Sequence, residues 1–252
     1  MDPIVLIHGM PLDSSMWTEQ AAFLRSRGHT VLTPDLPGFG SAPALAKDRT
    51  SIEAYAAVIR ELIETQAGGR AMVGGFSMGG YVLLALLREA PHLVSTAMFI
   101  DTRPDPDTSE ARKGRLTAIA GIESQGLAPF FDASIARLMR KKPDPATKAR
   151  IRAIMDRQSA PGIIAGQLAM SRRRDQTDLL ADLTIPVLVL VGAEDVITPP
   201  SVALNMQSHM PHAMVVQVVG AGHLAVMEQP AAVNGHLATF LATIRHAAPS
   251  GA

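Results

Sequence analysis

A chain of 252 residues, of which 47% are hydrophobic, is long enough to bury the core of one α/β domain. Its 23 basic and 23 acidic residues give a net charge of zero, which favours neither a nucleic acid nor an anionic membrane as a partner. The absence of cysteine excludes disulfides, thiolate metal sites and a cysteine nucleophile. No segment has the pattern of a signal peptide or a membrane span, so we expect a cytoplasmic protein.

Strands and helices are predicted to alternate along most of the chain. The strands are short apolar runs, and the helices are longer stretches with apolar residues at helical spacing. The predicted strands are residues 4–7, 30–33, 71–76, 97–100, 186–191 and 214–219. The predicted helices are residues 14–27, 51–66, 78–89, 201–208 and 230–246. This alternation predicts a mainly parallel sheet with helices on both faces, formed by residues 1–101 and 183–252.

Residues 102–182 interrupt the alternation. They contain no evident strand, and their amphipathic helical stretches are broken by prolines and glycines. We expect them to form a helical cap over the carboxyl edge of the sheet, where open α/β folds bind ligands. Several arginines of this segment are expected on solvated helix faces, namely Arg137, Arg140, Arg172, Arg173 and Arg174. An arginine that faced the site instead could pair with a substrate carboxylate.

The sequence Gly75-Phe76-Ser77-Met78-Gly79 stands between a predicted strand and a predicted helix. Gly-x-Ser-x-Gly in this context is typical of a nucleophile elbow, a sharp turn that projects the serine from the carboxyl edge of the sheet. Glycines two residues before and after the serine remove side chains that would collide as the strand and the helix approach each other. The same pattern also arises by chance, so the interpretation depends on the other residues at this edge.

Polar residues follow other strands at the same edge of the predicted sheet. His223 comes just after the last strand, where small neighbours would let its imidazole reach Ser77 and act as the base. Asp195 is expected to orient His223, and the adjacent Glu194 fits this role less well. Asp101, which also ends a strand, is the rival carboxylate.

Two backbone N–H groups are candidates for an oxyanion hole. Met78 begins the helix after Ser77, where N–H donors are free and the helix dipole favours negative charge. Gly9 permits a turn that points the N–H of Met10 toward the same hydroxyl. His8, in the same turn, is expected to bond local backbone rather than to take part in catalysis.

Apolar side chains are expected to line an acyl or alcohol pocket next to Ser77. Trp17 is among them, although a core anchor of the first helix is the more favoured interpretation of this residue. The candidate pocket residues are Trp17, Phe130, Phe131, Leu138, Met170 and Leu224.

Five segments of the chain resemble the α/β-hydrolase family. They are residues 8–13 (HGMPLD), 34–40 (PDLPGFG), 75–81 (GFSMGGY), 192–195 (GAED) and 220–223 (GAGH). The order serine, aspartate, histidine along the chain is also the order in that family. More narrowly, Asp101-Thr102-Arg103 and Met227-Glu228-Gln229-Pro230 resemble small bacterial carboxylesterases grouped with 3-oxoadipate enol-lactonases. Members usually carry a β-hairpin ahead of the first strand seen here, so we expect a sheet of about six strands, without that hairpin.

The resemblance implies a serine hydrolase that cleaves short- to medium-chain carboxylic esters through an acyl-enzyme on Ser77, with no metal and no organic cofactor. Its expected partner is a small-molecule ester. Lactone or enol-lactone hydrolysis, cofactor-free perhydrolysis and C–C bond hydrolysis could use the same residues. A ligand receptor that keeps these residues without turnover is a further alternative.

Overall fold

The computed structural model describes residues 2–46 and 49–247 of the chain. Within these ranges, six parallel strands form one sheet in the order β2-β1-β3-β4-β5-β6. The strands are β1 (Ile4–Ile7), β2 (Val31–Leu32), β3 (Ala71–Phe76), β4 (Val94–Ile100), β5 (Val187–Gly192) and β6 (Met214–Val218). The predicted parallel sheet of about six strands is therefore confirmed.

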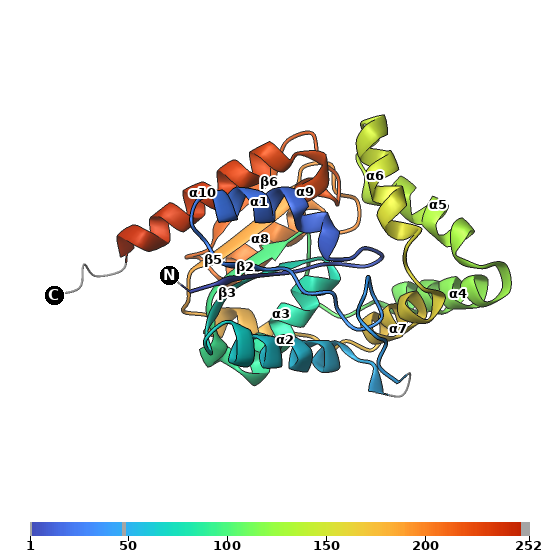
Figure 1. Ribbon diagram of the computed structural model, residues 1–252, viewed down its shortest axis with the longest axis horizontal. Coiled ribbons are helices and arrows are strands. Elements are labelled where there is room, and N and C mark those ends of the chain that lie inside the picture. The colour runs from blue at the N-terminus through green and yellow to red at the C-terminus, as the bar shows by residue number, and fades with distance from the viewer. Residues whose placement is uncertain (1, 47–48, 248–252) are drawn as a thin grey trace.

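Helices cover both faces of the sheet. Figure 1 shows α1 and α10 on one face, and α2 and α3 on the other. The α-helices of the described residues are α1 (Thr18–Ser26), α2 (Ile52–Gln66), α3 (Met78–Glu89), α4 (Ser109–Gln125), α5 (Leu127–Leu138), α6 (Pro145–Met155), α7 (Ala160–Ser171), α8 (Pro200–His209), α9 (Ala225–Glu228) and α10 (Pro230–Ala247). Short 3-10 helices are η1 (Ser14–Trp17), η3 (Pro91–Leu93) and η4 (Asp178–Asp182). No helix of the described ranges is both long and apolar enough to cross a membrane.

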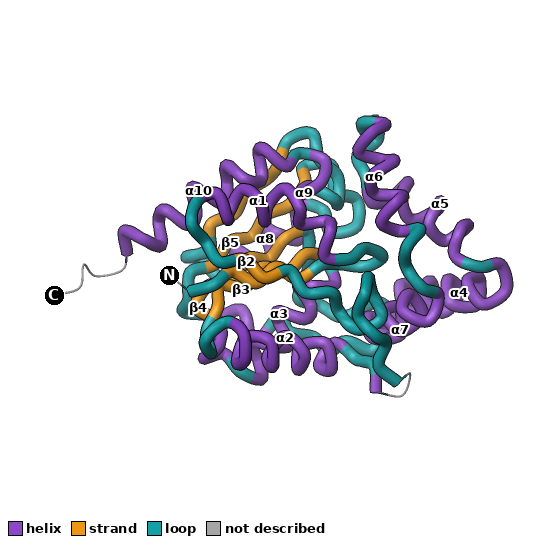
Figure 2. Tube along the Cα trace, in the orientation of Figure 1, coloured by secondary structure: helices purple, strands orange, loops and turns teal. Residues whose placement is uncertain are grey.

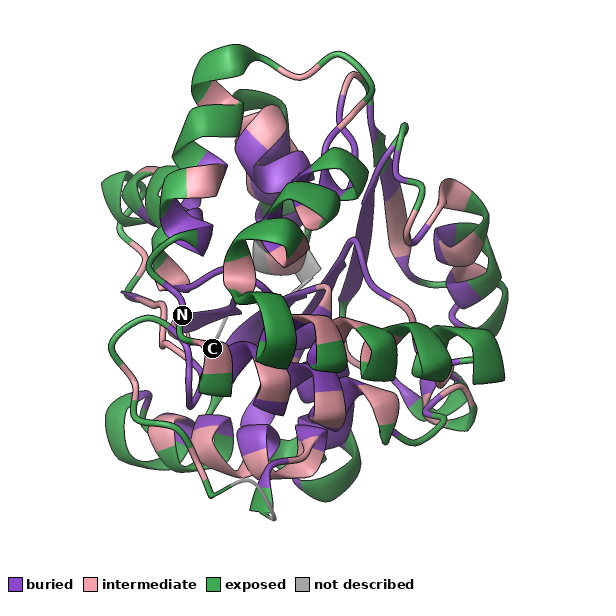
Figure 3. Cartoon of the chain, turned by 90° about the vertical axis from the view of Figure 1, so that its right-hand side faces the viewer, coloured by how far each residue is buried: buried purple, intermediate pink, exposed green. Residues whose placement is uncertain are grey.

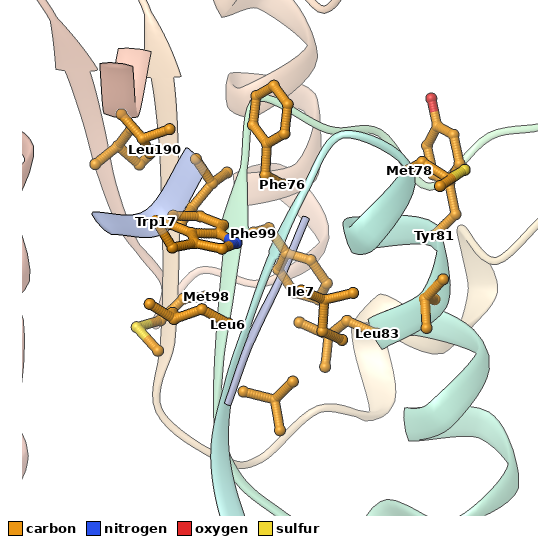
Figure 4. Close-up of a cluster of buried hydrophobic side chains, with 14 of the residues drawn as sticks. Leu6, Ile7, Trp17, Phe76, Met78, Tyr81, Leu83, Met98, Phe99 and Leu190 are labelled. Carbon is orange, nitrogen blue, oxygen red and sulfur yellow. The ribbon is translucent and has the colours of Figure 1, made fainter. Parts of the chain in front are cut away.

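The apolar strands are buried because helices shield the sheet on both sides. Every residue of β1, β3 and β5 is buried, which explains why these strands are continuous apolar runs rather than alternating ones. Figure 3 shows this buried sheet between helices whose outer faces are exposed. Figure 4 shows Leu6 and Phe99 in the core, with Trp17 of η1 in the same cluster.

Helices α4 to α7 lie between β4 and β5 in sequence and form a group beyond one end of the sheet (Figures 1 and 2). We refer to residues 102–182 as the helical segment. Only two residues of the long helix α4, Ile119 and Ile122, are buried, so most of this helix does not pack against a core.

A buried ion-pair network ties the helical segment to the core. Asp107 accepts hydrogen bonds from both Arg115 and Arg173, and the side chains of Asp107 and Arg173 are only 4% and 5% exposed. The guanidinium carbon of Arg173 lies 4.2 Å from the ring centroid of Tyr81 in α3. Burial raises the pKa of Asp107, but the bonds and charges of the two arginines outweigh it and lower that pKa below its usual value. Asp107 is therefore charged at neutral pH.

Three expectations are corrected by the structure. Arg173 does not lie on a solvated helix face, because it is buried against Asp107 and Tyr81. The helix expected over residues 14–27 is split into η1 and α1, and η1 is capped by the carboxylate of Asp13. The one-turn helix α9 has no counterpart among the predicted elements.

Replacing the buried acid tests how much the network stabilises the fold. We expect Asp107→Asn to lower the free energy of unfolding by about 3 kcal/mol, because it leaves two guanidinium groups without their counter-charge. Since the folded pKa of Asp107 is depressed, the stabilisation is present at neutral pH and is lost as the pH falls through that lowered pKa. Urea denaturation measures both effects.

Asp132→Asn is the matched control, because the Asp132 carboxylate pairs with Arg152 while 68% exposed. Its expected loss is below about 1 kcal/mol. Equal losses in the two variants would contradict a structural role for the buried network.

Candidate active site

Ser77 sits in a turn that few side chains tolerate. Its φ of 49° lies in the left-handed region, between the end of β3 and the first residue of α3. A Cβ at Gly75 would collide with the carbonyl of Gly79, and a Cβ at Gly79 would collide with the carbonyl of Ile7 in β1. The two glycines thus let α3 approach β3 and β1 closely, which is the physical reason for the Gly-x-Ser-x-Gly spacing.

Residues at the end of β4 and just after it hold the backbone of Ser77. Its N–H donates to the carbonyl of Ile100 over 2.9 Å, and its carbonyl accepts the hydroxyl of Thr102 over 2.8 Å. These contacts hold the strained residue in one conformation, so the hydroxyl group has a defined position at the edge of the sheet.

The structure brings Ser77, His223 and Asp195 into one line of hydrogen bonds. His223 Nε2 lies 2.9 Å from Ser77 Oγ, and His223 Nδ1 lies 2.7 Å from Asp195 Oδ2. The side chains of His223 and Asp195 are 2% and 0% exposed. Asp101, the rival carboxylate, makes no hydrogen bond to His223 but accepts the N–H of Gly192 over 2.7 Å.

Asp195 is held in its charged form by a ring of donors. Its carboxylate accepts the backbone N–H groups of Ile197 and Thr198 and the hydroxyl of Thr198. Burial raises the pKa of Asp195, but the hydrogen bond and charge of His223 and the bonds from Thr198 outweigh it and bring the pKa to about 2. A carboxylate at this position can fix the tautomer of His223, with a proton on Nδ1 and a lone pair on Nε2.

Glu228 and Thr198 support the site, and sequence reasoning assigned neither of them a role. Glu228 accepts the N–H of Gly222 and the N–H of Arg140, each over 2.9 Å, and so joins the His223 loop to the end of α5. A Cβ at Gly222 would collide with the backbone at Arg140. The tertiary contacts reveal these roles. For Glu228 the sequence offers one signal, which is its short spacing after His223.

The candidate oxyanion donors flank the serine. Met78 is the first residue of α3, directly after Ser77, and Met10 lies in the wall of the cavity next to Ser77. His8 Nε2 accepts the N–H of Leu36 over 2.9 Å. Burial lowers the pKa of His8, which keeps the ring neutral and fits the expected structural role.

The one group of potential metal ligands in the described part of the chain is Asp101, Asp195 and His223. His223 uses both ring nitrogens in hydrogen bonds, to Ser77 and to Asp195. The ring of His223 is therefore already engaged in bonds that orient it toward the serine.

A cavity of about 400 Å³ opens beside Ser77 and His223. The side chains around it come from α3, α4, α5, α7 and the loops of the sheet edge. They are Met10, Pro11, Ser77, Tyr81, Glu110, Ala111, Gly114, Arg115, Ala118, Phe130, Ser134, Arg137, Leu138, Gln167, Met170, Ile197 and His223.

Three of the six candidate pocket residues line this cavity, namely Phe130, Leu138 and Met170. The other three, Trp17, Phe131 and Leu224, lie in the hydrophobic core and are not part of the cavity wall.

Two arginines also line the cavity. Arg137 is exposed and stands in the cavity wall, which is the alternative that the sequence left open for the arginines of this segment. Arg115, for which no expectation was stated, lines the cavity while bonded to Asp107 and Gln167.

The sequence matches the family described as alpha/beta hydrolase fold over residues 2–230. BpoC of Mycobacterium tuberculosis, which bears the name of a non-heme bromoperoxidase, is 31% identical over 97% of this chain and 95% of its own length. A pimeloyl-acyl-carrier-protein methyl ester esterase of Pectobacterium atrosepticum is 27% identical over 94% of this chain and 93% of its own length. The structure of a thermophilic esterase from Thermogutta terrifontis with malate bound matches with a TM-score of 0.90 and 33% identity, over 97% of this chain and 90% of that chain.

The strain at Ser77 predicts an unusual order of stabilities. We expect Ser77→Gly to be at least as stable as Ser77→Ala, because glycine relieves about 1–3 kcal/mol of backbone strain at a positive φ. That relief exceeds the roughly 0.4–1 kcal/mol of unfolded-state entropy that glycine normally costs relative to alanine. Urea denaturation of the two variants measures the difference, and a clearly more stable alanine variant would show that the turn is not strained.

Proposed function

This chain belongs to the α/β-hydrolase fold family, and we therefore propose that it is a serine carboxylesterase acting on short- to medium-chain esters. The observation that carries the proposal is the line of hydrogen bonds from Ser77 through His223 to Asp195. The chain is similar to proteins named as esterases, which supports an ester bond as the bond that is cleaved.

His223 is the general base in this proposal. Its Nε2 lies 2.9 Å from the hydroxyl of Ser77, which is close enough to accept the proton as the oxygen attacks the ester carbonyl. The charged carboxylate of Asp195 stabilises the imidazolium that forms. His223 then gives the proton to the departing alcohol, and a water molecule activated in the same way releases the acyl group from Ser77.

The backbone N–H groups of Met78 and Met10 are the proposed oxyanion donors. Met78 is the first residue of α3, so its N–H has no partner within the helix and lies at the positive end of the helix dipole. Met10 lies in the loop after β1 and lines the same cavity as Ser77. Each such donor stabilises the transition state by about 3 kcal/mol.

The cavity supports a small substrate. Its volume of about 400 Å³ is at the small end of the range for ligand pockets. Phe130, Leu138 and Met170 give it an apolar wall that suits a short or medium acyl chain. In this proposal the helical segment acts as the cap that forms the pocket.

An ester or lactone that carries a carboxylate is the second candidate substrate. The side chain of Arg137 forms no hydrogen bond and no ion pair with any described residue, whereas the side chain of Arg115 is already bound to Asp107. Glu110 is also part of the wall and would repel an anion, so the favoured position is beside Arg137. The similar esterase of Thermogutta terrifontis was solved with malate, a small dicarboxylate, bound.

Removing the nucleophile tests the main proposal. We expect Ser77→Ala to lower kcat on a short nitrophenyl ester by about 10⁶-fold, as for other serines that act as a unit with a histidine. Turnover that survives in Ser77→Ala would refute the mechanism, and the absence of turnover in the wild type would favour a receptor.

A pair of matched esters tests the second candidate. We expect Arg137→Gln to lower kcat/KM about tenfold for a monoalkyl ester of a small dicarboxylic acid, and to leave the neutral ester of the same size unaffected. Arg140→Gln is the control, because Arg140 follows α5 without lining the cavity. Equal effects of Arg137→Gln on both esters would mean that the arginine recognises no anion.

A further inference from the structure

A second carboxyl group, that of Asp101, is buried next to the proposed catalytic residues but has no role in the mechanism above. One carboxyl oxygen of Asp101, one of Asp195 and one ring nitrogen of His223 lie within 4.8 Å of one another. Asp101 is 1% exposed, so water does not screen it from the other two groups.

The backbone of Asp101 is strained as well as buried. Its φ is 45°, and among the described residues only Ser77 and Asp101 combine a positive φ with a side chain. The two neighbours of Asp101 are the residues that hold the backbone of Ser77, through the carbonyl of Ile100 and the hydroxyl of Thr102. Such strain persists only where surrounding contacts impose it, and it is concentrated at functional sites.

The hydrogen bonds of Asp101 are asymmetric. Oδ1 accepts the N–H of Gly192, the residue that ends β5 and begins the turn leading to Asp195. The carbonyl of Gly192 accepts the N–H of Asp195 over 3.1 Å, so Asp101 fixes the first residue of that turn. Oδ2 is buried and has no hydrogen-bond partner. A buried carboxyl with one free oxygen is costly when charged and is better tolerated when protonated.

The surroundings of Asp101 and Asp195 favour one negative charge between the two carboxyl groups. Burial, followed by the charge of Asp195, raises the pKa of Asp101 well above its usual value, while the N–H groups of Gly192 and Ala225 oppose this only in part. The titratable groups that face Asp101 are Asp195 and His223. Asp195 has the richer set of donors, which favours the charge on Asp195 and the proton on Asp101.

We propose that Asp101 is a positioning residue that acts as a neutral carboxylic acid beside Asp195, and that it becomes the charged partner of His223 when Asp195 carries no charge. This inference rests on the proposed function. In an Asp195→Asn variant the neighbouring charge is gone, so one of the causes that raise the pKa of Asp101 is removed, and its carboxyl can ionise as His223 takes up a proton. Its carboxylate then stabilises the imidazolium of His223 over a short distance in a dry site.

A double-mutant cycle with the full chain and a nitrophenyl ester tests the proposal. Asp101→Asn keeps an acceptor for Gly192 and tolerates the left-handed backbone, so we expect it to lower kcat/KM only about threefold. Asp195→Asn should cost about 10²-fold, less than the roughly 10⁴-fold that loss of the only carboxylate costs. The double variant should lose at least about tenfold more than the two single effects combined.

The pH profile gives a readout that a purely structural role would not change. In Asp195→Asn, activity also requires an ionised Asp101, so the acid limb of log(kcat/KM) should be steeper than in the wild type by a slope of about one. In the double variant the limb should return to the wild-type slope. Asp195→Asn combined with Glu194→Gln is the control and should retain the steep limb, because Glu194 is exposed and lies outside the cluster.

Each result decides the matter. If Asp101→Asn lowers kcat/KM as much as Asp195→Asn does, Asp101 is already charged in the wild type. If the cycle is additive and the acid limb of log(kcat/KM) has the same slope in Asp195→Asn as in the wild type, Asp101 never supports His223. Either result overturns the inference while Ser77-dependent turnover stands, whereas loss of that dependence would refute the proposed function itself. Asp101→Gly, which removes the carboxyl and relieves the positive φ, replaces Asp101→Asn in the cycle if the asparagine variant does not fold.

Discussion

The site depends on a steric constraint, the close approach of α3 to β3 and β1 at Ser77. The serine can occupy its left-handed conformation only because Gly75 and Gly79 carry no side chains that would separate these elements. The strained residue is then held in place because its N–H donates to the carbonyl of Ile100 and its carbonyl accepts the hydroxyl of Thr102. The polar residues of the site are useful only because this turn places the hydroxyl where His223 can reach it.

Around the turn, charge is distributed unevenly over neighbouring carboxyl groups. Asp195 is surrounded by donors and remains ionised, whereas Asp101 is fully buried with one unpartnered oxygen and favours the neutral form. The surroundings of two similar residues thus favour opposite protonation states within a few ångströms of each other. Because both carboxyl groups are buried, the number of hydrogen-bond donors around each of them decides which one is better able to carry the charge.

The sequence was sufficient to predict the parallel sheet and the residues that meet at its edge, because apolar runs, glycine spacing and strand ends are local signals. It predicted the boundaries of α2 well, since Ser51 caps that helix through the N–H of Ala54. It favoured Trp17 as a core anchor, which agrees with the burial of this residue, but it did not predict the burial of Arg173. The burial of Arg173 depends on its pairing with Asp107, and these two residues are far apart in the chain.

The link that Glu228 makes between the His223 loop and α5 has a consequence for redesign of substrate scope. The pocket wall and the histidine are parts of one mechanical unit, since the N–H of Leu224 also bonds the carbonyl of Leu138. A graft of a foreign α5 onto this scaffold would therefore shift the imidazole along with the wall. Laboratory evolution of selectivity should accordingly recover compensating changes near residue 228, rather than changes confined to the new helix.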